Sequence, residues 1–130
     1  MKTVSSFDDI ADLEADVDDE NVGNNRQYIG SNRAKAALRT MKKSALTNEL
    51  LLNGGEIDGT KFTATSDISE NKLVYGDFSS IAIAQFGDIE ITLDPYTQAV
   101  NGCIRLVINS YFDFKIVRPE CLAFANVVKE

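Results

Sequence analysis

The chain has 130 residues, of which 44% are hydrophobic and 25% are charged, and it contains no His and no Trp. This length is sufficient to bury one hydrophobic core without disulfide bonds. The absence of His excludes Ser-His-Asp and Cys-His catalysis, and it excludes zinc sites other than all-Cys or carboxylate sites. The composition therefore argues against most enzyme classes.

The formal net charge of −7 originates at the start of the chain. Residues 1–20 hold eight of the 20 acidic residues and one of the 13 basic residues, Lys2, so twelve of each remain in the rest. Nucleic-acid binding requires a surplus of Lys and Arg over an extended face, so we expect no specific nucleic-acid partner. No apolar segment approaches the roughly 20 residues of a membrane span, and no secretory signal is present. We expect a soluble, cytoplasmic protein without a membrane partner.

Two helices are predicted in the first third of the chain. Ser6 and Asp9 form a capping-box pattern, and the apolar residues that follow have helical spacing, which predicts a helix over residues 7–17. Residues 26–31 read as a short strand that ends at Gly30. A second helix follows, capped by Ser31 or Asn32. Its apolar stripe consists of Ala34, Ala37, Leu38 and Met41. Lys42 and Lys43 lie in its last turn, where the helix dipole favours cations.

The remaining chain reads as strands. Residues 44–72 have the pattern of short strands joined by Gly turns. Residues 73–87 read as two strands interrupted at Gly76 and Asp77, and the Ile-Ala-Ile-Ala run at residues 81–84 predicts a strand that is buried on both faces at the sheet centre. A half-exposed strand at residues 89–93 should end at Pro95.

A long alternating segment follows the Asn101-Gly102 pair, which predicts a tight hairpin. Period two continues for some sixteen residues, roughly 50 Å at ~3.3 Å per residue, whereas a compact domain of this size has a radius of gyration near ~14 Å. This strand must bend, pair within a projecting ribbon, or find its partner on another subunit. One face of the strand carries Ile104, Leu106, Ile108, Phe112, Phe114 and Ile116.

Few residues are suited to hold a metal or a cofactor. Cys103 and Cys121 lie in apolar contexts, so we expect two buried thiols and no disulfide. Asp16, Asp18 and Glu20 resemble the start of an EF-hand loop, but Asn21 replaces the required Gly and Gln27 replaces the bidentate Glu. We therefore expect no metal, no cofactor and no catalytic site.

The ordered combination of these segments resembles the carboxyl end of tailed-bacteriophage major capsid proteins. In that family a Gly-Asp-Phe strand precedes an Ile-rich strand, a variable loop and a long strand with an Arg, a later Asp and a closing Ala-Phe pair. The matching positions here are Gly76, Asp77, Phe78, Arg105, Asp113, Arg118, Pro119, Ala123 and Phe124. The amino-terminal arm, the extended loop and the spine helix of the family have no counterpart, so the chain resembles the last third of a capsid subunit.

The resemblance implies an α+β fold: an axial-domain-like sheet flanked by two helices, plus a long β-ribbon segment from the peripheral domain. Residues 1–96 would form the axial domain, and residues 97–130 would return to the peripheral domain. The implied function is structural self-assembly in a phage or prophage capsid, without catalysis. The partners would be copies of the chain in a capsomer ring and other capsid subunits, located in the virion and, during assembly, in the host cytoplasm.

The acidic first helix and the basic second helix suggest complementary faces for such a ring, in which one face meets a different face of the neighbour. The candidate interface residues are Arg33, Arg39, Lys43, Asp12, Asp16, Phe112, Phe114 and Ile116. One alternative is a carboxylate-dependent hydrolase that uses Asp77, Asp88 or Asp94. Another is a module that captures an extended peptide on the open strand edge between Ile104 and Ile116.

Overall fold

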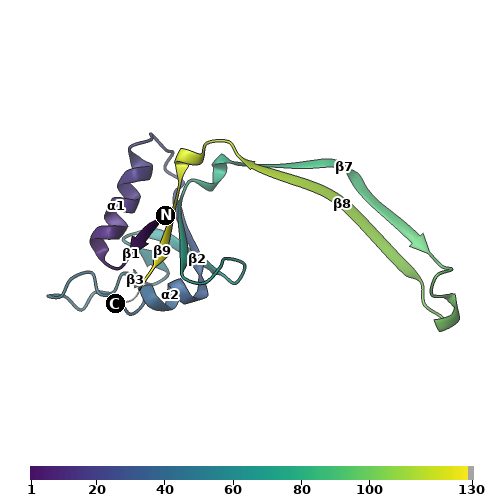
Figure 1. Cartoon of the computed structure of the whole chain (residues 1–130), viewed down its shortest axis with the longest axis horizontal. Helices are drawn as coiled ribbons and strands as arrows, with labels where there is room; N and C mark the ends of the chain where they lie inside the picture. The colour runs from purple at the N-terminus through teal and green to yellow at the C-terminus, as the bar shows by residue number, and fades with distance from the viewer. Residues whose placement is uncertain (129–130) are drawn as a thin grey trace. The chain divides into compact units, whose positions relative to one another are not determined.

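The computed structural model describes residues 1–128 and divides into two compact units (Figure 1). The first comprises Met1–Ser80 together with the chain from Arg118 onward, and the second comprises Ile81–Val117. The expected division at residues 96/97 falls instead within the turn of the second unit. A division that followed the compact units would place the segment after Arg118 with the axial part. The assignment of residues 1–96 and 97–130 to two capsid domains stays a prediction.

The first unit contains a seven-stranded mixed sheet in the order β1-β9-β6-β2-β5-β4-β3. The central strands β6 and β2 pair antiparallel, whereas β2–β5 and β1–β9 pair parallel. The predicted strand at residues 26–31 is confirmed as β2, and the predicted interruption after Gly76 is confirmed as the end of β6. The strands are β1 (Lys2–Val4), β2 (Gln27–Ser31), β3 (Leu52–Asn53), β4 (Glu56–Ile57), β5 (Thr60–Thr65), β6 (Lys72–Gly76) and β9 (Leu122–Val127).

Helix α1 (Phe7–Asp18) begins at the predicted capping box, in which the Ser6 side chain accepts from the Asp9 N–H and the Asp9 carboxylate accepts from the Ser6 N–H. Helix α2 (Asn32–Leu38) begins at the Ser31 cap but is shorter than predicted. The expected continuation through Met41 to Lys43 is wrong, because the Leu51 N–H donates to the Met41 carbonyl and the Lys43 N–H donates to the Glu49 carbonyl. These bonds hold the segment extended, with Lys42 in a bridge to Leu50.

Both helices pack on one face of the sheet. Register places Tyr28 beside Tyr75, Gly30 beside Leu73 and Leu73 beside Ala125, so these residues share a face. They are buried together with the apolar stripes of α1 and α2, which include Ile10, Leu13, Val17, Ala34 and Leu38. Helix α1 contacts β1, β9 and β6, whereas α2 contacts β2, β5 and β9. The helices therefore cover different parts of the same layer.

The second unit is an antiparallel hairpin of β7 (Ile81–Asp94) and β8 (Arg105–Ile116). Three residues of β7 oppose one residue of β8 between the Phe86–Tyr111 and Glu90–Asn109 pairs, so β7 carries a bulge of two extra residues. An even insertion leaves every side chain after the bulge on its original face. The long strand thus finds its partner in a two-stranded ribbon.

Three predictions for this region differ from the structure in whole or in part. The run at residues 81–84 is not a buried central strand but the start of β7, where Ile83 is 74% exposed. The hairpin predicted at Asn101-Gly102 is confirmed, since these residues lie in the connection between β7 and β8, but its turn is not tight: the connection extends from Pro95 to Ile104 and includes a 3₁₀ turn at Ala99–Asn101. The alternating strand has twelve residues, not sixteen. No helix of the described residues is long and apolar enough to cross a membrane.

Candidate functional site

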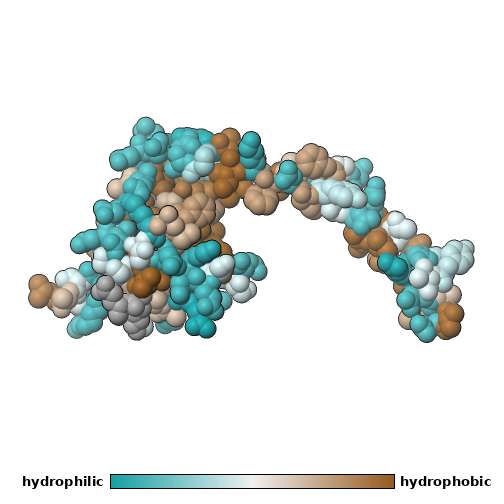
Figure 2. Space-filling model, in the orientation of Figure 1, coloured by the Kyte–Doolittle hydropathy of each residue, from teal (hydrophilic) through white to brown (hydrophobic). Residues whose placement is uncertain are grey.

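The hairpin presents one face that is almost entirely apolar. Paired residues of an antiparallel ladder project to the same side, so this face is defined by five cross-strand pairs in which Gln85 is the single polar residue. The pairs are Ile81–Ile116, Ile83–Phe114, Gln85–Phe112, Ile91–Ile108 and Leu93–Leu106. We call these residues the apolar face. In Figure 2 hydrophobic residues recur along the length of β7 and β8.

The side chains of the apolar face are largely exposed within the described residues. Ile83 is 74% exposed, Phe114 is 72% exposed and Phe112 is 63% exposed, whereas Ile116 is half-buried. The sequence therefore located all five β8 members of this face: Leu106, Ile108, Phe112, Phe114 and Ile116. It did not identify their β7 partners, although the Ile83 and Ile91 positions have the same period-two spacing as β8.

The opposite face of the hairpin is mixed. Its six pairs carry five charged residues, and its one aromatic pair is Phe86–Tyr111. The two residues of that pair are 58% and 61% exposed, respectively. The two faces therefore differ in polarity although both are open to solvent in the described chain, and the apolar face is the one suited to contact another surface.

The acidic residues of α1 differ in their partners. Asp16 pairs with Lys2 at 2.5 Å, and Asp18 pairs with Arg26. Glu14 accepts a hydrogen bond from the Tyr28 hydroxyl. The Asp12 side chain is exposed and has no cation partner among residues 1–128. Of the two acidic interface candidates, Asp16 is thus engaged within the chain and Asp12 is not.

The basic candidates near α2 also divide into engaged and free side chains. Arg33 Nε lies 3.1 Å from Glu70 Oε1. Lys43 Nζ lies 3.2 Å from Asp58 Oδ1 and 3.9 Å from Glu49 Oε2, and it lies 5.7 Å from the centre of the Phe7 ring. Arg39 is exposed and has no acidic partner in the described part of the chain. Among these three cations only Arg39 has no ion pair within the described residues.

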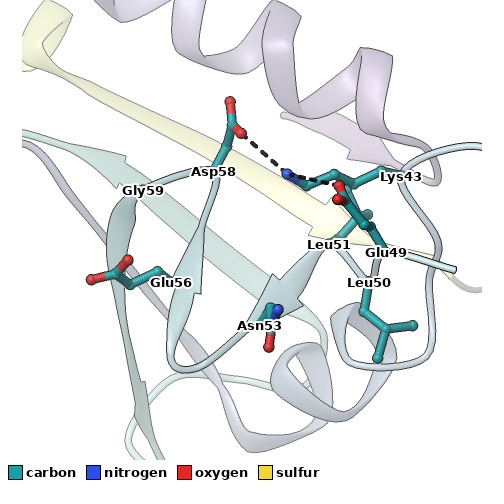
Figure 3. Close-up of a pocket in the computed structure, with 8 residues that line it drawn as sticks. All are labelled: Lys43, Glu49, Leu50, Leu51, Asn53, Glu56, Asp58 and Gly59. Atoms are coloured by element: carbon teal, nitrogen blue, oxygen red, sulfur yellow. Dashed lines mark hydrogen bonds and ion pairs between the residues drawn. The ribbon is translucent and has the colours of Figure 1, made fainter. Parts of the chain in front are cut away.

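Lys43 borders the polar cavity of about 240 Å³ shown in Figure 3. Its ammonium group points between Asp58 and Glu49, and dashed lines mark both ion pairs. Glu56 and Asn53 complete the polar lining. Lys43 neutralises part of this acidic surface from within the chain. The lining residues include no nucleophile paired with a base, so they do not form a catalytic arrangement.

The three candidate carboxylates of a hydrolase act as turn residues or lie far apart. Asp77 accepts a hydrogen bond from the Ser79 N–H, and hydrogen bonds from Ser79 lower the pKa of Asp77. Asp94 accepts from Thr97 and Tyr96, and its bond with Thr97 is the first cause of its lowered pKa. Asp88 and Asp94 are six residues apart on β7, roughly 20 Å along an extended strand. The pKa values of Asp77 and Asp94 are thus shifted in the same direction, whereas an acid and base pair needs shifts in opposite directions.

The two thiols lie in different environments. Cys121 is buried at 3% exposure, as expected, whereas the expectation of a buried Cys103 is wrong because Cys103 lies in the exposed hairpin turn. Both are free. Within residues 1–128 no group of three or more His, Cys, Asp or Glu side chains is placed to hold a metal ion.

Comparisons with known proteins connect this fold to viral shells. The Phage capsid family model matches residues 2–127. The major capsid protein of Halomonas phage phiHAP-1 is 26% identical over 121 residues, which cover 92% of this chain and 20% of that protein. The chain therefore spans about a fifth of the length of the curated relative.

Solved structures show the same fold. The structure from Mycobacterium phage Che8 matches with a TM-score of 0.67 at 17% identity, and the match covers 97% of this chain and 51% of that one. The virus-like particle from Pyrococcus furiosus matches with a TM-score of 0.63 at 18% identity, over 97% of this chain and 55% of that one. The α+β expectation and the capsid resemblance are thereby confirmed: with a family model that covers nearly its whole length, the chain belongs to the phage capsid family.

Proposed function

We propose that this chain is a structural part of a phage or prophage capsid subunit and that it acts by binding copies of itself side by side in a capsomer, without catalysis. The observation that carries the proposal is the exposed apolar face of the β7–β8 hairpin. A two-stranded hairpin alone is only marginally stable in water. Contact with another surface would stabilise it, and a family whose members form shells supplies that contact.

The proposal assigns the interface to the residues expected from the sequence. Phe112, Phe114 and Ile116 belong to the apolar face, and Asp12 and Arg39 are the charged candidates without a partner in the described chain. Arg33, Lys43 and Asp16 would exchange their internal ion pairs for contacts to a neighbour. The other capsid subunits would be further partners, and the site of action would be the virion, after assembly in the host cytoplasm.

The experiment that tests the proposal compares the two faces of the hairpin. The variant Ile83→Thr with Phe114→Thr changes one cross-strand pair of the apolar face, and Thr retains high strand propensity. The matched control, Phe86→Thr with Tyr111→Thr, changes the aromatic pair of the opposite face, which is similarly exposed. Sedimentation velocity over a range of concentrations measures the self-association of each.

We expect the wild-type chain and the control to associate as the concentration rises, and the apolar-face variant to remain monomeric. Circular dichroism should give the same spectrum for all three, because the changes preserve strand propensity and remove no buried side chain. Equal loss of association in both variants would contradict the proposal, and so would a wild-type chain that stays monomeric throughout.

A further inference from the structure

Two carboxylates of α1 and the carboxylate of its C-cap residue, Asp19, form a row on the outer surface of the helix. At about 100° per residue, Asp8, Asp12 and Asp19 lie within about 40° of one another on the helix circumference, opposite the buried stripe of Ile10 and Val17. All three are exposed, and their side chains have no hydrogen bond or cation partner among residues 1–128. The other acids of the helix are engaged internally: Asp9, Glu14, Asp16 and Asp18.

A pair of cations of opposite sign lies at the end of α2, on its last-turn residue Lys35 and its C-cap residue Arg39. Lys35 and Arg39 are four residues apart, so they share a helix face, and both are exposed without an acidic partner in the described residues. Together with Leu52 they border a cavity of about 240 Å³ above the Gly54-Gly55 turn. A Cβ atom at either glycine would meet nothing within 4 Å, so the space around this turn is unfilled.

Each row places two like charges side by side on a helix surface. Like charges at i and i+4 repel each other on a helix surface. None of the four side chains has an ion-pair partner in the described residues, and the Lys2 ammonium near Asp12 donates to its backbone carbonyl and pairs with Asp16. The pairs Asp8–Asp12 and Lys35–Arg39 have the same i, i+4 spacing, about 5–6 Å between Cβ atoms. Each cation of one pair can therefore reach one carboxylate of the other when two helices lie alongside each other.

We propose that Asp8 and Asp12 of one copy bind Lys35 and Arg39 of the next copy. This inference rests on the proposed function, and it specifies the charged contact of the ring. Helix α1 packs toward β1 and α2 packs toward β5, at different parts of the same layer. A chain with opposite charges at two separate places forms a head-to-tail contact, which is the kind that generates rings.

Two charge-reversed chains test the contact. The first carries Lys35→Glu and Arg39→Glu, and the second carries Asp8→Lys and Asp12→Lys. Either chain alone places like charges in every contact, so self-association should fall by about tenfold or more. In an equimolar mixture each contact between unlike chains regains opposite charges, so the mixture should associate as the wild type does. Sedimentation velocity of each chain and of the mixture is the measurement.

Two further chains complete the design. Lys61→Glu with Lys72→Glu makes the same change in net charge at two exposed strand positions, and it should leave association unchanged. Asp8→Asn with Asp12→Asn removes the carboxylates without placing a cation in the first helical turn, and it should weaken association less than the reversal does. Recovery in the mixture also shows that both reversed chains are folded.

Failure of the mixture to recover would overturn the contact, and so would charge-reversed chains that sediment like the wild type. If they do so while Ile83→Thr with Phe114→Thr abolishes association, the charged contact is wrong and the proposed function stands. If the wild type shows no association, both are wrong. Added salt should weaken the association of the wild type more than that of the Lys35→Glu, Arg39→Glu chain. An equal drop for both chains would likewise contradict the charged contact.

Discussion

The hydroxyl group of Tyr28 donates a hydrogen bond to Glu14 Oε1 and thereby joins the central strand β2 to helix α1. The Tyr28 side chain is fully buried, and its ring lies 4.6 Å from the Tyr75 ring, centroid to centroid, at an interplanar angle of 35°. Burial raises the pKa of Tyr28, and the bond to Glu14 raises it further. Burial is also the first cause of the raised pKa of Tyr75. The centre of the sheet is thus linked to α1 through a neutral phenol.

This arrangement predicts loss of stability in base. A tyrosine whose pKa is higher in the folded than in the unfolded state contributes stability that is complete below the unfolded pKa, about 10, and is lost as the pH rises above it. Tyr28→Phe should lower the free energy of unfolding by about 2 kcal/mol at neutral pH, because a hydrogen bond to a charged group is removed. It should also make the decline above pH 10 shallower.

Urea unfolding between pH 7 and pH 11 measures both effects. The matched control is Tyr96→Phe. Tyr96 is 85% exposed in the hairpin turn, and its hydroxyl group makes no hydrogen bond within the described residues. That variant should keep the wild-type stability at neutral pH. Identical slopes above pH 10 for the wild type and Tyr28→Phe would show that the buried phenol does not control base unfolding.

The cap of α1 predicts an effect in acid. The Ser5 N–H and the Ser6 hydroxyl donate to the Asp9 carboxylate and hold its pKa below the usual range. A carboxyl whose pKa is lowered by folding contributes stability above its unfolded pKa, about 4, and that stability is lost as the pH falls through the lower folded value. Ser6→Ala should cost about 1 kcal/mol at neutral pH, as expected for a lost N-cap.

Asp8→Asn is the control for the cap, because Asp8 lies in the same first turn but makes no capping bond. Its effect should be confined to the helix dipole, about 0.5 kcal/mol. Thermal unfolding at pH 7 and pH 3 should separate the wild type from Asp9→Asn at the higher pH and bring the two closer at the lower pH. A constant difference between them at both pH values would exclude a role for Asp9 ionisation.

Elements with local signals could be predicted from the sequence. The four-residue capping box from Ser6 to Asp9 specifies the start of α1. Its buried face is specified by Ile10, Leu13 and Val17. The end of α2 could not be predicted in this way, because Met41 and Lys43 are held extended by backbone bonds to Leu51 and Glu49 across a loop. A contact of that kind leaves no trace in helical periodicity.

The hairpin shows a second limit. The apolar run at Ile81–Ala84 has the composition of a buried central strand, yet it lies in a two-stranded ribbon. An apolar composition indicates that a face contacts another apolar surface, but it does not indicate whether that other surface belongs to the same chain. For the same reason the charges of both helices were evident from the sequence, whereas the pairing of Arg26 with Asp18 and of Lys43 with Asp58 was not.

The last prediction concerns Gly76, at the end of β6, where the backbone before β9 lies so close that no side chain fits. A Cβ atom there would lie 2.0 Å from the Cys121 carbonyl oxygen and 3.0 Å from Leu122 Cα, and the residue has a φ of +147°. Gly76→Ala must displace the backbone that accepts from the Asp77 N–H, so we expect a loss of about 3–4 kcal/mol. Gly59→Ala has a φ of +82° but nothing within 4 Å, so it should cost only about 1–2 kcal/mol of backbone strain. Urea midpoints compare the two, and equal losses would show that the close approach of β6 to β9 does not limit the fold.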